Sequence, residues 1–128
     1  MRCWLTEPRP SRENFQEEIL VSFTLYFAEG SIVILEDSKN TLLELFAEVA
    51  KRQAVEVQVT GHTDTLGKES DNDRLSEERA QAIKGILIAQ GLKSNFIRAV
   101  GRGSRDLLIP TPPNVREPRN RRVEVIVR

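Results

Sequence analysis

Apolar residues recur at two spacings along the chain, and the spacing of every second residue marks the strands. Residues 19–27 are rich in β-branched and aromatic side chains, and in residues 55–59 valine alternates with polar residues. Both segments are therefore predicted to be strands, the second with one buried face. Residues 96–100 and 123–127 are shorter apolar runs, and they predict two further strands.

Helical spacing appears in two other segments. Residues 37–51 place five apolar side chains on one face, which predicts an amphipathic helix. A second helix is expected to start at Asn72 or Asp73, because either side chain can cap a helix, and to run to about Gln90. Gly91 follows as the stop signal.

This order of elements, β-α-β-α-β-β, predicts an α+β fold. We expect a two-layer sandwich with a mixed four-stranded sheet and two helices packed on one face. Residues 1–18 are polar and contain Pro8 and Pro10, so they are predicted to be a poorly ordered leader or linker. Residues 19–128 form the predicted domain.

Composition narrows the classes of function. The 128 residues carry 19 Lys and Arg and 19 Asp and Glu, a net charge of zero, which argues against nucleic acid as a partner. The single cysteine, Cys3, forms no internal disulfide. No apolar run approaches the roughly 18 residues of a membrane span, and no signal peptide is recognisable. The chain is thus expected to be cytosolic or a piece of a longer exported protein.

The polar segment 61–71 and the helix after it carry the candidate chemistry. Asp64 follows a predicted strand end, and Arg79 lies on the next helix, whose side chains lean back toward the loop. Two interpretations are open. The pair could clamp a zwitterion, with an ammonium on Asp64 and a carboxylate on the Arg79 fork, or Asp64 and Arg79 could pair with each other.

Catalysis finds little support in the sequence. His62 and Asp64 have a spacing seen in some metal sites, but the chain has no second histidine to complete a ligand set. A structural role for His62 is favoured over a metal-assisted hydrolase, and no serine or cysteine nucleophile has a suitable partner. We therefore expect no enzyme, no metal and no cofactor.

Several spaced motifs resemble the OmpA-like peptidoglycan-binding domain, the module shared by OmpA, Pal and MotB proteins. They are Gly-His-Thr-Asp-Thr-Leu-Gly at 61–67, Asn-Asp-Arg-Leu-Ser-Glu-Glu-Arg-Ala at 72–80, Gly-Leu at 91–92, Gly-Arg-Gly at 101–103 and Asn-Arg-Arg-Val-Glu at 120–124. Upstream, residues 27–31 look like the family's exit from its first strand. The resemblance covers about residues 20–128.

The resemblance implies non-covalent binding of peptidoglycan through the diaminopimelate of its stem peptide. The family's ligand-gripping aspartate and arginine match Asp64 and Arg79. Further residues expected at the ligand by the same comparison are Asn72, Leu75, Gly30, Thr63 and one arginine of the pair Arg121 and Arg122, of which Arg122 is taken as the candidate.

A wall-facing location is also implied: the periplasm, associated with the outer membrane, as part of a longer exported protein that acts as a monomer. The chain departs from many members after Gly103, where residues 104–108 precede Pro110. The edge of the binding site on this side is therefore expected to differ in shape from that of other members. The alternative function is a structural or protein–protein interaction domain that keeps the fold without binding the wall.

Overall fold

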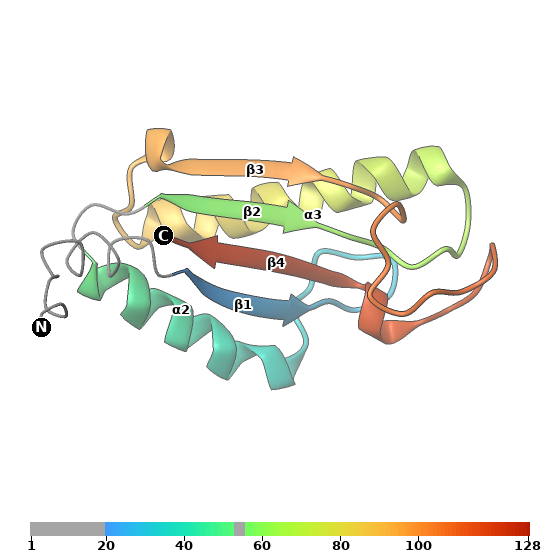
Figure 1. Ribbon diagram of the computed structural model, residues 1–128, viewed down its shortest axis with the longest axis horizontal. Helices are drawn as coiled ribbons and strands as arrows, with labels where there is room; N and C mark the ends of the chain where they lie inside the picture. Colours follow the sequence, from blue (N-terminus) through green and yellow to red (C-terminus); the bar gives the residue numbers. More distant parts are fainter. Residues whose placement is uncertain (1–19, 53–55) are drawn as a thin grey trace, which may run out of the picture.

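The computed structural model describes residues 20–52 and 56–128 (Figure 1). The predicted leader at 1–18 and the first residue of each of the first two predicted strands lie outside the described residues. The strands and α-helices are, in chain order, β1 (Val21–Tyr26), α2 (Lys39–Lys51), β2 (Val57–Gly61), α3 (Glu69–Ala89), β3 (Ile97–Gly101) and β4 (Arg122–Val127). Single 3-10 turns cover Glu36–Ser38, Ser94–Phe96 and Pro118–Asn120.

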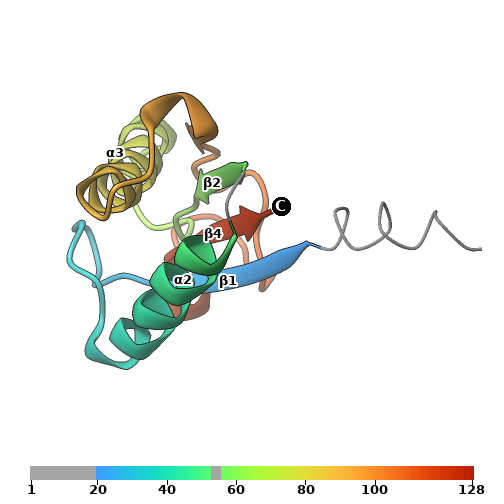
Figure 2. The ribbon, with the colours of Figure 1, turned by 90° about the vertical axis from the view of Figure 1, so that its left-hand side faces the viewer.

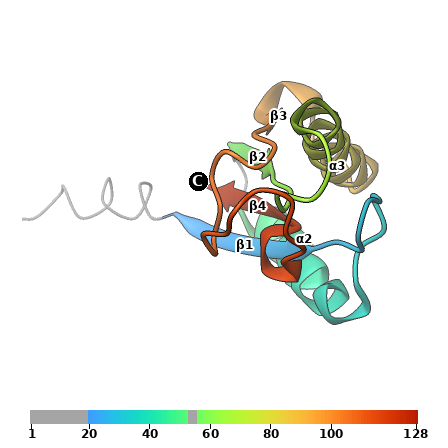
Figure 3. The same ribbon diagram turned by 90° about the vertical axis from the view of Figure 1, so that its right-hand side faces the viewer.

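The four strands form one mixed sheet in the order β1-β4-β2-β3. β4 is antiparallel to both of its neighbours, whereas β2 and β3 are parallel. Helices α2 and α3 lie on the same side of this sheet (Figures 2 and 3). The predicted α+β sandwich with two helices on one face is therefore confirmed.

Strand alternation explains which face is covered. In β4, Val123, Val125 and Val127 are fully buried while the residues between them are half-buried, as expected of a sheet with one face on the core. The buried apolar residues that fill the space between sheet and helices are Leu25, Phe27, Leu45, Val57, Val59, Ala80, Ile83, Leu87, Ile97, Val123, Val125 and Val127.

The start of α3 differs from the prediction. The helix begins at Glu69, after Gly67 has turned the chain with a φ of +83°, so the polar loop is shorter than 61–71. The prediction that Asn72 or Asp73 caps the helix is therefore wrong. Asn72 lies inside the first turn and donates from Nδ2 to the carbonyls of Asp64 (3.3 Å) and Leu66 (3.1 Å).

Two glycines allow α3 to approach the sheet closely. A Cβ at Gly61 would overlap the carbonyl of Ser76, and one at Gly101 would overlap the backbone N of Glu77. These contacts are with helix backbone, which has little freedom to move. The C-terminal ends of β2 and β3 thus fix how far the first half of α3 stands from the sheet.

We predict that Gly61→Ala lowers the free energy of unfolding by about 1–3 kcal/mol, because the added methyl group forces α3 away from β2. Gly85→Ala, in α3, is the control, since a Cβ there meets no atom within 4 Å beyond its own stretch of helix. It should stabilise the protein by roughly 0.5–1 kcal/mol. Urea denaturation measures both, and equal effects of the two substitutions would contradict the close approach.

Candidate functional site

The segment that carries the predicted chemistry continues directly from the end of β2. The backbone N–H of His62 donates to the carbonyl of Arg122, and that of Thr63 donates to the carbonyl of Gly103, each at 2.8 Å. Both side chains are buried. Asp64 is the next residue. Its position is therefore set by the hydrogen bonds of His62 to β4 and of Thr63 to the loop after β3.

Asp64 is almost fully buried, with 6% of its surface exposed. Its Oδ1 accepts from the backbone N–H of Leu66 at 3.2 Å, and its Oδ2 accepts from the backbone N–H of Glu117, also at 3.2 Å. The Nε of Arg121 donates to the same Oδ2 at 2.9 Å. The carboxylate is thus held by three donors, one from the loop after β2 and two from the segment before β4.

Arg79 has no exposed surface at all. Its guanidinium donates to three backbone carbonyls: Nε to Ser31 (2.9 Å), Nη1 to His62 (2.9 Å) and Nη2 to Ala28 (3.0 Å). The guanidinium carbon also lies 5.4 Å from the centroid of the Phe27 ring, within the range of a cation–π contact. These contacts tie the turn after β1 to the loop after β2.

Asp64 and Arg79 form no ion pair with each other in the part of the chain that the structure describes. Burial lowers the pKa of Arg79 to about 10, with the charge of Asp64 opposing this shift and that of Arg121 adding to it. Arg79 therefore stays charged at neutral pH. Of the two roles considered for the pair, mutual pairing is not what the structure contains.

The turn after β1, residues 28–31, links the buried Asp64 and Arg79 to exposed charged residues. Gly30 adopts a φ of +63° there, a left-handed conformation that favours glycine. The preceding residue, Glu29, accepts from Arg116 Nε at 3.1 and 3.2 Å and from Arg121 Nη2 at 3.4 Å. The turn is thereby bridged to the segment before β4.

A hollow of about 690 Å³ lies between this turn and the outer side of α3. Among the predicted ligand residues it brings together Gly30 and the half-buried Leu75. Its full lining is Gly30, Ser31, Ile32, Val33, Leu75, Glu78, Gln81 and Ala82. Ile32 and Val33 are 50% and 62% exposed, which makes this hollow mostly apolar.

Of the two candidate arginines, Arg121 reaches Asp64. Arg122 belongs to β4 and donates to the carboxylate of Glu124 (2.8 Å) and the carbonyl of Asp106 (3.1 Å). Arg121 lies just before the strand, at the end of the 3-10 turn Pro118–Asn120, and the two arginines contact different groups. Any ligand role of Arg122 would therefore act away from Asp64.

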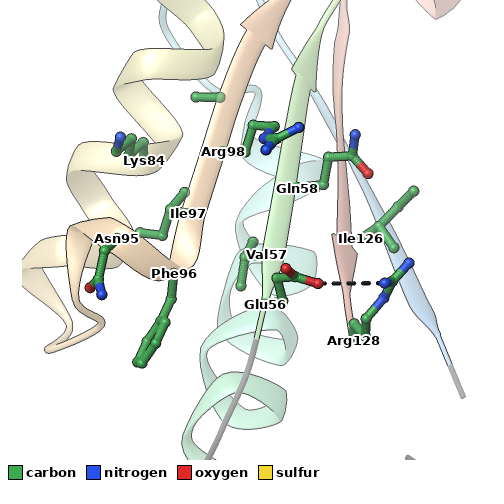
Figure 4. A pocket seen from close by; sticks show the side chains of 11 residues that line it. Glu56, Val57, Gln58, Lys84, Asn95, Phe96, Ile97, Arg98, Ile126 and Arg128 are labelled. Atoms are coloured by element: carbon green, nitrogen blue, oxygen red, sulfur yellow. Dashed lines mark ion pairs between the residues drawn. The ribbon is translucent and has the colours of Figure 1, made fainter. Parts of the chain in front are cut away.

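A second hollow, of about 630 Å³, lies at the opposite end of β2 from Asp64 (Figure 4). Its lining includes Lys84, Arg98 and the ion pair between Glu56 and Arg128, which are 3.5 Å apart. It contains none of the predicted ligand residues.

The sequence pattern left three contributors unassigned. Glu29 and Arg116 were not singled out as partners of the site, and Asn120 was named only as part of a family motif. Asn120 is fully buried and exchanges two 2.9 Å hydrogen bonds with the backbone of Ile109, which fixes the proline-rich connection. Its place in the Asn-Arg-Arg-Val-Glu motif at 120–124 is the one signal that the sequence offered for Asn120.

The described residues contain neither a metal-ligand cluster nor a membrane-spanning helix. Within residues 20–52 and 56–128, no three His, Cys, Asp or Glu side chains are grouped so that they could hold a metal ion. Nor does any helix in these two ranges have both the length and the apolar character to cross a membrane.

The mixed sheet, the two helices on one face and the Asp64–Arg79 region after β2 define an OmpA-like domain. The OmpA family matches residues 26–121, three quarters of the chain. The chain belongs to the OmpA family.

Two curated relatives illustrate the likeness in sequence. An outer membrane protein of Gluconacetobacter diazotrophicus is 39% identical over 94 residues, which are 66% of this chain and 25% of the relative. Outer membrane porin F of Pseudomonas fluorescens is 30% identical over 109 residues, 85% of this chain and 33% of the relative. The chain thus spans no more than a third of either relative.

Solved structures agree on the fold. The OmpA-like domain of FopA1 from Francisella tularensis has a TM-score of 0.72 at 25% identity, over 84% of this chain and 71% of that one. The peptidoglycan-associated lipoprotein from Burkholderia pseudomallei has a TM-score of 0.73 at 20% identity, over 83% and 90% of the two chains.

His62 makes stability depend on pH. Its ring is 3% exposed, and burial, aided by the positive charge of Arg122, lowers its pKa from 6.5 to about 4. Between these values the unfolded chain binds a proton that the folded protein does not, so stability falls as the pH drops through this window. We expect His62 to contribute a loss of about 3 kcal/mol between pH 7 and pH 4.

Urea denaturation at several pH values, with His62→Gln as the comparison, measures this loss. The variant should show a flatter dependence between pH 6.5 and 4 than the wild type. Parallel curves would mean that His62 is not the titrating group.

Proposed function

We propose that this domain binds peptidoglycan non-covalently through the diaminopimelate of the stem peptide and so anchors an envelope protein to the cell wall. Membership of the OmpA family and the outer membrane proteins among its relatives support an envelope role. The observation that carries the proposal is the buried carboxylate of Asp64, which Arg121 and two backbone N–H groups hold in place. The proposed role is binding rather than catalysis.

The free end of diaminopimelate is a zwitterion, with an ammonium and a carboxylate on one carbon. We assign the ammonium to Asp64, whose oxygens can accept further hydrogen bonds beside those from Leu66 and Glu117. A charge-assisted contact in such a partly desolvated place contributes about 1.5–3 kcal/mol. Thr63, Asn72 and Leu75 remain proposed neighbours of the ligand.

The carboxylate of the ligand is assigned to the Arg79 side of the site. Because Arg79 is fully buried and donates to the carbonyls of Ala28 and Ser31, the turn at 28–31 must move before a carboxylate can reach it. Gly30, with no atom near the position of a Cβ, gives this turn room to change conformation. Binding therefore includes a rearrangement of the turn.

Affinity for one stem peptide should be modest, micromolar to millimolar in order of magnitude, because few contacts carry it. The wall is a polymer that presents many stem peptides, and multivalent attachment raises the apparent affinity without new contacts. The proposed location is the periplasmic side of the envelope, within a longer protein, with peptidoglycan as the partner and no cofactor.

One observation favours a second candidate, a structural or protein–protein interaction domain without wall binding. Arg79 is already satisfied by three carbonyls, and Asp64 already pairs with Arg121. A site whose charges are all paired can serve the fold alone. In that case the apolar hollow lined by Ile32 and Val33 is the surface that a partner protein would use.

Co-sedimentation with purified peptidoglycan sacculi tests the proposal. Asp64→Asn keeps the shape of the side chain but removes its charge, so we expect sacculus binding to weaken at least tenfold. Asp71→Asn is the matched control, an exposed aspartate that pairs only with Arg74 among the described residues. It should bind as the wild type does.

Folding of each variant is checked by circular dichroism and a thermal melt. Wild-type protein that stays in the supernatant, or equal sedimentation of Asp64→Asn and wild type, would leave the interaction-domain alternative standing instead.

A further inference from the structure

Four charged residues of alternating sign form a chain from the buried site to the surface. Asp64 pairs with Arg121 at 2.9 Å, Arg121 with Glu29 at 3.4 Å, and Glu29 with Arg116 at 3.1 Å. Exposure rises along the chain, from 8% and 12% for the side chains of Asp64 and Arg121 to 44% for Glu29 and 68% for Arg116. The outer end of the chain is therefore open to solvent.

In this series of ion pairs, Glu29 is the carboxylate that belongs to the turn after β1. Its neighbour Ala28 supplies a carbonyl to Arg79, and Ser31 supplies another. Arg116 and Arg121 both come from the segment before β4, on the other side of the site. The ion pairs of Glu29 thus hold the turn over Arg79 from outside.

We propose that Arg116 and Arg121 form a carboxylate-binding subsite, and that Glu29 occupies it while no ligand is bound. A ligand with a second free carboxylate, beside that of its amino-acid end, replaces Glu29 on the two arginines. The turn then loses its outer attachment and uncovers Arg79. This inference rests on the proposed function. It adds that the subsite selects which wall peptides bind.

The chemistry of the two arginines fits this role. Arg121 keeps its Nε on Asp64 and directs Nη2 toward Glu29, so the same side chain connects the ammonium site and the subsite. Arg116 uses its Nε for both oxygens of Glu29, and an incoming carboxylate can accept the same donors. Because Glu29 and Arg116 are largely exposed, their pairing is weak enough to be displaced.

Isothermal titration with two small probes isolates the subsite. Meso-diaminopimelate carries two carboxylates, whereas L-lysine has the same carbon chain with one carboxylate less. The variants are Glu29→Gln, which vacates the subsite, and Arg116→Gln, which removes half of it. Glu36→Gln and Arg119→Gln are matched controls, because these exposed residues pair with Lys39 and Glu117 instead.

Glu29→Gln should bind meso-diaminopimelate about two- to fivefold more tightly than the wild type, and Arg116→Gln should bind it about two- to fivefold more weakly. Affinity for L-lysine should not fall in Arg116→Gln, and it should rise in Glu29→Gln, because release of the turn uncovers Arg79 for the one carboxylate of lysine. The two controls should match the wild type with either probe.

Two outcomes overturn the inference, and they differ in what else they affect. If wild type binds sacculi and meso-diaminopimelate but neither substitution alters its preference over L-lysine, the subsite is wrong and the proposed function stands. If neither wild type nor Glu29→Gln binds meso-diaminopimelate or sacculi, both fall. Binding that appears only in Glu29→Gln supports the occupied subsite directly.

Discussion

The side chain of Arg79 carries a positive charge into a part of the protein without solvent contact, and three backbone carbonyls converge on it. Two of them come from the turn at 28–31 and one from His62. A buried cation without partners would cost several kcal/mol, so these segments are constrained to meet at the guanidinium. The close approach of α3 to Gly61 and Gly101 places Arg79 where they can.

The position of Asp64 follows from the same convergence. Its carboxylate sits between the loop after β2 and the segment before β4, and Arg121 balances its charge. Arg79 and Asp64 thus lie in the same region of the fold and hold different segments in place. Both charges are satisfied within the fold, Arg79 by three carbonyls and Asp64 by Arg121, and these are the partners that the ligand of the proposed function would replace.

The spacing of apolar residues was sufficient to predict the order of elements and the two-layer architecture. An element that is buried on one side places its apolar residues at every second position in a strand, or along one face of a helix. The prediction failed at the start of α3, where residues 69–71 are polar and exposed and carry no such pattern. Asp64 and Arg79 were predicted as a ligand-binding pair from their chain positions, and that role stays a prediction. The pairing of Asp64 with Arg121, 57 residues away, and of Glu29 with Arg121, 92 residues away, depends on tertiary packing that no local pattern encodes.

The most direct measurement of the central claim is a crystal structure of the domain with a diaminopimelate-containing tripeptide. The ammonium of the ligand should lie within hydrogen-bonding distance of Asp64, with Glu29 displaced from Arg121 and the turn at 28–31 moved away from Arg79. A peptide bound elsewhere, for example in the hollow beside Arg98 and Lys84, with Asp64, Arg121 and Glu29 still paired as here, would contradict the account.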